Sequence, residues 1–243
     1  MKSYKTLLVI CEFAICLGLS LLLFVAYETW GKVGELTADQ AQLDQQLSQS
    51  WDGVSSQGES ARNSTSPSIA SRGPAPGIPA PRAAAEGQTV SNKGEPLVRL
   101  YIPILGMHWT VLEGTDLGHL KRGPGHYIGT QKPGEVGNFS VAGHRSVGMF
   151  WDLDKVHAGD SVVIEGRSDW YVYRVSSSQI VSPSATEVLA PVPGRPGVVP
   201  TESKIVLTTC NPRWDNYERL VVTGDLVRTS SKAQERPIEL GGG

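Results

Sequence analysis

The sequence has few cysteines, and only one of them lies outside its apolar N-terminal segment. The 243 residues contain three cysteines, Cys11, Cys16 and Cys210. A framework of several disulfides is therefore excluded for the rest of the chain, because Cys210 has no second cysteine there with which to pair. A lone cysteine of this kind is either a reactive thiol or a small buried hydrophobe, and its surroundings have to decide between the two.

The chain also lacks an excess of charge of either sign. Its 22 Lys and Arg residues against 24 Asp and Glu residues give a formal net charge of −2, and the basic residues are scattered. We therefore expect no nucleic-acid partner. No cluster of acidic residues has the spacing of a calcium-binding loop, so we expect no metal and no cofactor.

One long apolar run lies near the N-terminus. Residues 6–27 read TLLVICEFAICLGLSLLLFVAY, about the 20 apolar residues that a helix needs to cross a bilayer. Lys2 and Lys5 precede the run, which predicts that residues 1–5 are cytoplasmic. A cleaved signal peptide is the alternative, but its apolar core would be shorter, about 7–15 residues, and would end in small residues. We expect a single-pass anchor in the cell membrane, with the rest of the chain outside the cell.

Two segments of different composition follow the apolar run. Residues 28–51 include Leu36, Leu43 and Leu47, a spacing typical of an amphipathic helix. With so few apolar residues, we interpret this segment as a short solvated stalk rather than a weak pairing helix. Residues 52–94 are rich in Pro, Gly, Ser and Ala and contain no aromatic residue. Such a composition buries too little apolar area to fold, so it predicts a flexible, disordered linker.

The following residues, 95–228, have the pattern of an all-β domain. Short runs enriched in Val, Ile, Tyr and Thr alternate with Gly, Pro, Asn and Asp. The expected strands are residues 97–103, 109–113, 138–143, 160–166, 170–181, 204–209 and 219–227. Short helical patterns occur near residues 115–121 and 185–189. We expect a closed or nearly closed barrel, followed by a C-terminal tail of residues 229–243 that has no interpretable pattern.

Three chemically reactive side chains stand at the ends of expected strands. His144 follows the strand FSVAG, Cys210 ends the strand KIVLTT, and Arg219 opens the strand RLVV. A thiol, with a pKa of about 8.5, needs a base or a cation beside it to attack a carbonyl. An imidazole can return a proton to a leaving amine, and a guanidinium can donate to a developing oxyanion. The three residues fit nucleophile, acid/base and oxyanion stabiliser, although His144 could be structural and Arg219 could pair with Glu218 or Asp225.

Two longer stretches resemble the signature regions of sortases, the cell-wall transpeptidases of Gram-positive bacteria. They are GPGHYIGTQKPGEVGNFSVAGHR at residues 123–145 and IVLTTCNPRWDNYERLVV at residues 205–222. The first is most similar to class E, with class D as the near rival, and Val206 stands where many members have Thr. The resemblance implies an eight-stranded β-barrel. It also implies that the three residues above are the family's catalytic cysteine, histidine and arginine.

The resemblance further implies a reaction. Sortases recognise a C-terminal sorting signal of LPXTG type, for which class E members prefer LAXTG, on secreted proteins. They cleave between Thr and Gly, hold the acyl chain as a thioester on the cysteine, here Cys210, and transfer it to an amine of a peptidoglycan precursor or to a pilin lysine. Residues 52–95 lack the lid motif of pilin polymerases, which disfavours the second acceptor. An extracytoplasmic cysteine endopeptidase and a non-enzymatic anchored β-domain are the alternatives.

Several residues close to these motifs have two interpretations. His126 and Tyr127 either line the substrate site or pack a loop, and the same choice holds for Trp214 and Tyr217. Two threonines precede the cysteine, and strand alternation predicts that one of them faces the site.

Overall fold

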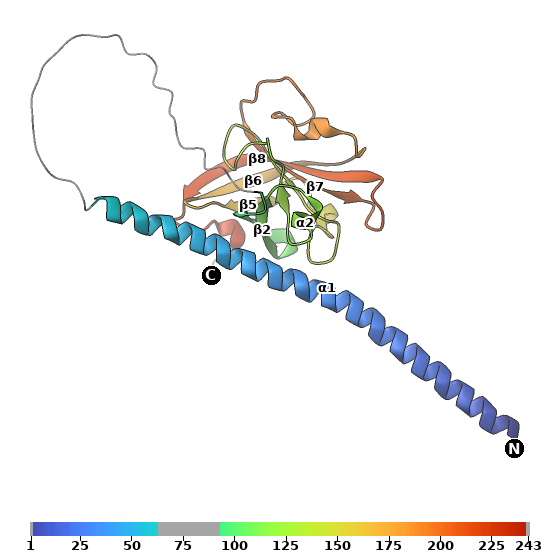
Figure 1. Ribbon diagram of the computed structural model, residues 1–243. Coiled ribbons are helices and arrows are strands. Elements are labelled where there is room, and N and C mark those ends of the chain that lie inside the picture. The colour runs from blue at the N-terminus through green and yellow to red at the C-terminus, as the bar shows by residue number, and fades with distance from the viewer. Residues whose placement is uncertain (1, 63–92, 242–243) are drawn as a thin grey trace, which may run out of the picture.

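The computed structural model describes residues 2–62 and 93–241, which form one long helix and one barrel (Figure 1). The helix α1 spans Lys2–Arg62. The strands are β1 (Pro96–Ile102), β2 (Met107–Glu113), β3 (Gly125–His126), β4 (Gly137–Ala142), β5 (Ser161–Glu165), β6 (Asp169–Val181), β7 (Ser203–Asn211) and β8 (Glu218–Ser231). Shorter helical segments are α2 (Leu117–Leu120), η1 (Pro103–Leu105), η2 (Leu153–Lys155), η3 (Thr186–Leu189) and η4 (Ile238–Leu240).

The eight strands close into a barrel in the order β1-β2-β3-β4-β7-β8-β6-β5. Closure comes from β5, which pairs with β6 on one side and with β1 on the other. Two neighbouring pairs, β2–β3 and β4–β7, are parallel, and the others are antiparallel. The structure therefore confirms the predicted all-β fold and the eight-stranded barrel.

The predicted strands agree with the observed ones, with ends that differ by a few residues. Each of the seven predicted segments coincides with a strand, and α2 and η3 lie in the two segments with a short helical pattern. The sequence does not predict β3, because its two residues are too few to show an alternation. β8 runs on to Ser231, into the segment predicted to be a C-terminal tail.

The core lies inside the barrel and is built by alternation along the strands. On β7, Ile205 and Leu207 belong to the large apolar cluster of the interior. Val206, between them, belongs to a separate cluster with Val188 of η3. The connection between β6 and β7 therefore covers the outer face of β7, and β7 is buried on both faces over this stretch.

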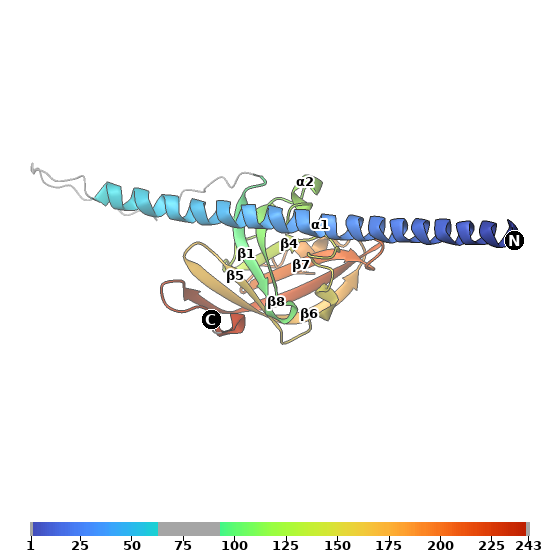
Figure 2. The same ribbon diagram turned by 90° about the horizontal axis from the view of Figure 1, so that it is seen from below.

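Part of α1 docks on the barrel. The helix runs along one side of the barrel, and its N-terminal half extends beyond it (Figures 1 and 2). Residues 36–51, which we call the docked segment, include Leu43 and Leu47, only 0% and 1% exposed where α1 contacts β1 and β2. Leu36 packs against the barrel core. The structure thus differs from the expected solvated stalk, because burial of these leucines supplies stabilisation that a short isolated helix lacks.

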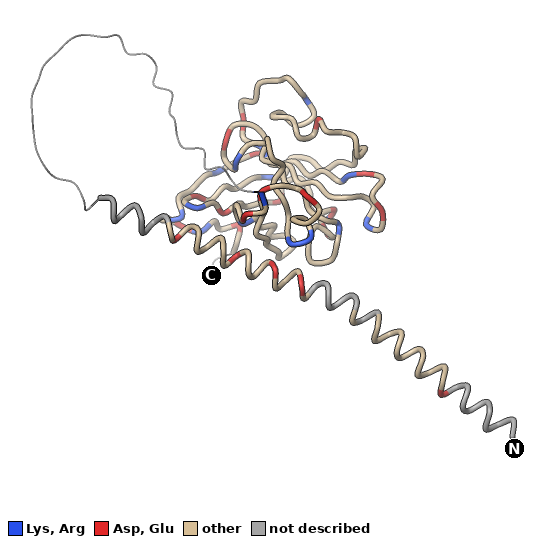
Figure 3. Tube along the Cα trace, in the orientation of Figure 1, with Lys and Arg blue, Asp and Glu red and all other residues tan. Residues whose placement is uncertain are grey.

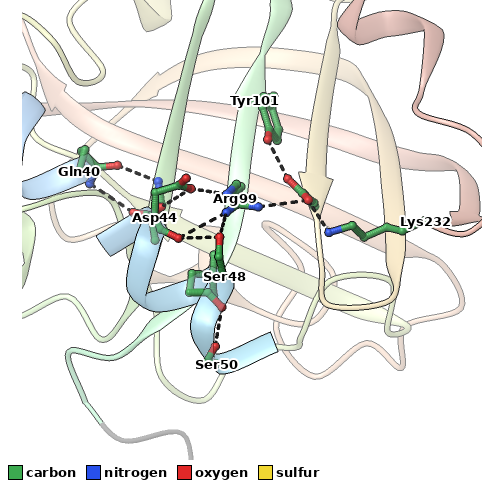
Figure 4. A network of polar contacts seen from close by, with 10 residues as sticks. Gln40, Asp44, Ser48, Ser50, Arg99, Tyr101 and Lys232 are labelled. Atoms are coloured by element: carbon green, nitrogen blue, oxygen red, sulfur yellow. Dashed lines mark hydrogen bonds and ion pairs between the residues drawn. The ribbon is translucent and has the colours of Figure 1, made fainter. Parts of the chain in front are cut away.

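The docked segment also turns a row of polar side chains toward the barrel (Figure 4). The Oε1 atom of Gln40 accepts a hydrogen bond from the backbone N–H of Thr110 at 2.7 Å. Asp44 forms an ion pair with Arg99 of β1, which also donates from Nη2 to Ser48 Oγ at 2.6 Å. Residues spaced by four share one face of a helix, so this row and the buried leucines lie side by side.

The docked segment ends at Trp51, whose ring contacts two cations. The ring centroid is 4.9 Å from Cζ of Arg99 and 4.3 Å from Nζ of Lys232. Both cations also pair with Glu165 of β5, at 3.2 Å from Arg99 Nη1. Cation–π contacts of this kind are worth about 0.5–2 kcal/mol. The network therefore joins α1 to β1, β5 and the segment after β8.

The rest of α1 overlaps the predicted linker and the predicted membrane anchor. The helix continues past Trp51 to Arg62, into the segment predicted to be a linker, and residues 63–92 lie outside the described residues. The anchor predicted over residues 6–27 falls within α1 and is not confirmed. Across the part of the chain whose placement is described, no helix offers a stretch both long enough and apolar enough to span a membrane.

Candidate active site

Strand register pairs two of the three predicted site residues, and the third follows the end of a neighbouring strand. Cys210 on β7 is the direct partner of Arg219 on β8. On the other side of β7, the parallel ladder ends with the pair Ala142 and Thr208, and the backbone N–H of Gly143, the first residue past β4, donates to the Thr208 carbonyl at 3.0 Å. His144 is two residues past Ala142, as Cys210 is two residues past Thr208. Direct partners on adjacent strands are about 5 Å apart, so the Cys210 thiol and the Arg219 guanidinium lie on neighbouring strands.

Alternation turns Cys210 and Arg219 to the outer face of the barrel wall. On each of their strands a core residue that points inward lies an odd number of positions away: Leu207 from Cys210, and Leu220 from Arg219. Side chains an odd number apart on a strand point to opposite faces. Cys210 is half-buried, so its thiol stands at the outer wall and not in the apolar interior.

His144 is held by the loop that follows it. The backbone N–H of His144 donates to Sδ of Met149 at 3.1 Å, and its backbone carbonyl accepts from the backbone N–H of Phe150 at 3.1 Å. The ring of Phe150 packs so closely on Gly143 that a Cβ there would lie 2.5 Å from Cδ2. Burial lowers the pKa of His144 below its ordinary value, and the positive charge of Lys121 adds to this effect. The imidazole is therefore mostly neutral at pH 7 and able to accept a proton.

Arg219 is anchored at the end of the loop between β7 and β8. Its Nη1 atom donates to the carbonyl oxygens of Asn216 at 2.7 Å and Glu218 at 2.8 Å. Asn211 donates from Nδ2 to Oε2 of Glu218 at 2.7 Å, which closes the loop from the other strand. Within the described residues, Nε and Nη2 of Arg219 make no hydrogen bond, so these donors are available to a ligand. Among the described residues Arg219 forms no ion pair with Glu218 or Asp225, the alternative role that the sequence left open.

The neighbouring residues His126 and Tyr127 have different surroundings in the structure. His126 is 1% exposed, and its Nδ1 lies 2.8 Å from Oε1 of Glu113, which also pairs with Lys132. Burial alone would raise the pKa of Glu113, but the hydrogen bonds from His126 and Lys132 outweigh it and lower the pKa to about 2. His126 is therefore part of a buried structural network. Tyr127 instead reaches the β7 wall, with its hydroxyl 3.0 Å from Oγ1 of Thr208.

The structure also shows the exposure of the other candidate site residues near Cys210. Thr208 shares the outward face of Cys210, whereas Thr209 points inward and is 3% exposed. Trp214 is 85% exposed, and its ring meets Trp151 edge-on at 4.7 Å. Tyr217 is 62% exposed in the same loop. Neither aromatic packs the loop interior, so both are accessible surface beside the site.

Sequence reasoning misses one residue of this site, Arg145. Its side chain is only 3% exposed, and its Nη1 donates to the carbonyl oxygen of Cys210 at 3.3 Å. The Gly-His-Arg stretch gives a signal for an arginine at this position. What the sequence does not reveal is that the guanidinium turns inward and meets the main chain of the thiol residue.

Comparisons with known proteins agree with this arrangement. A family model described as a sortase domain matches residues 100–227. Sortase SrtE1 of Streptomyces coelicolor is 29% identical over 239 residues, which cover 94% of this chain and 59% of that protein. Sortase SrtE2 of the same organism is 35% identical over 156 residues, which cover 58% of this chain and 60% of that protein. The chain thus spans about 60% of the length of these relatives.

Solved structures point the same way. The crystal structure of Sortase E1 from Streptomyces coelicolor, which holds a tripeptide in its active site, is 33% identical with a TM-score of 0.57. The match covers 60% of this chain and 97% of that one. These relatives carry class E names, and Sortase D of Bacillus subtilis is also similar, with 26% identity over 113 residues that cover 46% of this chain and 53% of that protein. The family model spans more than half of the sequence. The chain therefore belongs to the sortase family.

Proposed function

We propose that this chain is a membrane-anchored sortase that works as a cysteine transpeptidase on secreted proteins. Its substrate is a C-terminal sorting signal of LPXTG or LAXTG type, cleaved between Thr and Gly. The acyl part passes through a thioester on Cys210 to an amine acceptor of the cell wall, which we take to be a peptidoglycan precursor. The observation that supports the proposal is the direct pairing of Cys210 on β7 with Arg219 on β8, with His144 two residues past the end of β4, the strand on the other side of β7.

The first half of the reaction forms the thioester. The neutral imidazole of His144 accepts the thiol proton, and the sulfur of Cys210 attacks the carbonyl carbon of the substrate threonine. The carbonyl oxygen becomes negative, and the free N–H donors of Arg219 stabilise it. As the carbon–nitrogen bond breaks, the imidazolium returns its proton to the leaving glycine nitrogen. The glycine segment departs as a neutral amine.

The second half reverses these roles with a new amine. The acceptor nitrogen attacks the thioester carbon and gives its proton to the imidazole. The carbon–sulfur bond then breaks, and the proton returns to sulfur, which regenerates the thiol. Water in place of the amine would give simple hydrolysis, so the acceptor and not the cysteine chemistry distinguishes a transpeptidase from an endopeptidase.

The test uses the full chain in detergent with LAXTG and LPXTG peptides and an amine acceptor. We expect a ligated product and, by mass spectrometry, an acyl adduct on Cys210. Cys210→Ala should abolish both. Cys16→Ala is the matched control, because that cysteine is exposed on α1 and should leave turnover unchanged.

The outcomes separate the alternatives. Cleavage with water as the only acceptor, at any amine concentration, would favour an endopeptidase. An intact chain that neither cleaves the peptides nor reacts with a small thiol electrophile at Cys210 would favour a non-enzymatic β-domain. Near-normal turnover by the Cys210→Ala variant would refute the assignment of the nucleophile.

Membrane anchoring is the second part of the proposal and rests on the sequence of residues 6–27. We expect the chain to stay with membranes after alkaline extraction. A membrane-impermeant maleimide applied to intact cells should label Cys210, which we place outside the cell. Release of the chain by alkaline extraction, or protection of Cys210 in intact cells, would contradict the anchor or its orientation.

A further inference from the structure

Arg145 is a buried cation in the loop that carries His144. Arginine is rarely buried to this extent unless it is paired, and here the side chain is only 3% exposed. All three nitrogens of its guanidinium are engaged. Nε donates to the carbonyl of Trp151 at 2.9 Å, Nη1 to the carbonyl of Cys210 at 3.3 Å, and Nη2 pairs with Asp154 at 3.0 Å. The guanidinium thus joins the loop after His144, the end of β7 and η2.

A second arginine, Arg213, pairs with the same carboxylate. Arg213, three residues past Cys210, donates from Nη2 to both oxygens of Asp154, at 2.8 and 2.9 Å. The same atom lies 3.2 Å from Oδ1 of Asp152. Asp154 therefore bridges the residue that follows His144 and the loop that follows Cys210. These hydrogen bonds and charges lower the pKa of Asp154 although its partial burial opposes them, so it stays ionised over the working pH range.

We propose that Arg145 is a positioning residue that, through Asp154 and Arg213, fixes the Cys210 main chain relative to His144. We call these three residues the clamp. The inference rests on the proposed sortase function, because it assigns the clamp to the geometry of the thiol–imidazole pair. Neither Arg145 nor Arg213 needs to touch the substrate. The clamp sets the position of the Cys210 sulfur, and Arg219 remains the hydrogen-bond donor to the oxyanion.

The rate of proton transfer depends on the distance between the Cys210 sulfur and the His144 imidazole. Proton transfer needs the sulfur and the imidazole nitrogen within hydrogen-bond reach, and a misplacement of about 1 Å can cost about 100-fold in rate. His144 lies past the end of the β4 ladder, so strand pairing alone does not hold it. The Arg145 bonds provide a direct tie from its neighbour to the cysteine residue. The charge of a lysine would not replace this tie, because a lysine lacks the fork that reaches three partners.

The test compares Arg145→Gln, Arg145→Lys and Arg213→Gln with wild type in the full chain. We expect both Arg145 variants to lower kcat for ligation by about tenfold or more, with KM changed less than about threefold since the substrate contacts remain. The rate of Cys210 alkylation against pH should shift as well, which loss of stability alone would not produce. Arg174→Gln is the control, because that arginine also donates to a carbonyl, of Gly159, but is exposed on β6.

Arg213→Gln keeps the inference testable if the Arg145 variants do not fold. Its side chain is 32% exposed, so its removal leaves no buried unpaired charge, and we expect kcat to fall about threefold with the fold intact. A kcat within twofold of wild type for folded Arg145→Gln, or for Arg213→Gln when Arg145→Gln is unfolded, would overturn the clamp. Rescue by Arg145→Lys would also overturn it, because charge alone would then suffice. If wild type and Arg174→Gln fail to ligate, the proposed function fails, not the clamp.

Discussion

Shortening Leu47 to alanine tests whether the docked segment is part of the folded domain. Leu47 is 1% exposed, and Leu43 one turn earlier is fully buried. Both stand where α1 contacts β1 and β2. The substitution removes three carbons from a closed contact and leaves a cavity, since the helix backbone is held by the neighbouring Asp44 and Ser48 contacts with Arg99.

The expected cost follows from that burial. Fully buried leucines shortened to alanine lose about 2–5 kcal/mol. If undocking of α1 and unfolding of the barrel are separate events, the loss appears first as undocking. A loss of about 2 kcal/mol multiplies the undocked population by about 30. Backbone amides of residues 43–51 should therefore exchange with deuterium about 30-fold faster in the variant, because exchange in stable helices proceeds through local opening.

The assay is hydrogen exchange followed by mass spectrometry on the full chain in detergent. Gln46→Ala is the matched control, because Gln46 is exposed on the same helix turn and alanine favours helix, so its change should stay within about 0.5 kcal/mol. An exchange rate in Leu47→Ala within twofold of wild type would show that the docked segment contributes nothing to the native state. The docking of residues 36–51 on the barrel would then be refuted.

Three other changes have definite expected results. Lys121→Gln should raise the pKa of His144, because it removes a positive charge that disfavours the imidazolium. A titration of the imidazole by NMR measures this pKa, with Lys121→Arg as the control. An unchanged pKa in Lys121→Gln would contradict the reasoning. Glu113→Gln should flatten the loss of stability in acid: the folded pKa of Glu113 is about 2 against an ordinary 4.5, so its contribution is present above pH 4.5 and is lost as the pH falls toward 2. Denaturant unfolding at pH 5 and pH 3 tests this, and an equal acid loss in wild type and variant would refute it. Gly143→Ala should lower the free energy of unfolding by about 1–3 kcal/mol and slow ligation, because the added Cβ would lie 2.5 Å from the ring of Phe150. Gly118→Ala is the control, because a Cβ at Gly118 meets nothing within 4 Å. Equal stability of the two variants would show that the ring moves freely.

Most of the barrel could be predicted because its strands carry their own alternation. The places of Cys210 and Arg219 at strand ends were enough to predict that they meet, since β7 and β8 pair them directly, and His144 follows the end of β4, which also pairs with β7. The role of each in catalysis stays a prediction. β3 could not be predicted, because its two residues pair through backbone hydrogen bonds with β2 and β4 and show no pattern of their own.

Docking of α1 could not be predicted for a different reason. Gln40, Asp44 and Ser48 form a polar row next to the leucines, and such a row is usually a solvated helix face. Here Asp44 and Ser48 contact Arg99, whose charge is visible in the sequence but whose contact with the helix is not. The same holds for Arg145. Its burial depends on where η2 places Asp154, and that is a property of the folded loop.

The location of the site on the outer wall follows from the same alternation that builds the core. Leu207 must point inward to fill the barrel, and Cys210 three positions later must therefore point outward. A shift of β7 by one residue would exchange the two faces, bury the thiol and expose the leucine. The hydrophobic pattern of β7 thus fixes both the stability of the barrel and the face on which the Cys210 thiol lies. On that outer face Tyr127 and Thr208 meet, and the exposed Trp214 lies in the loop after β7.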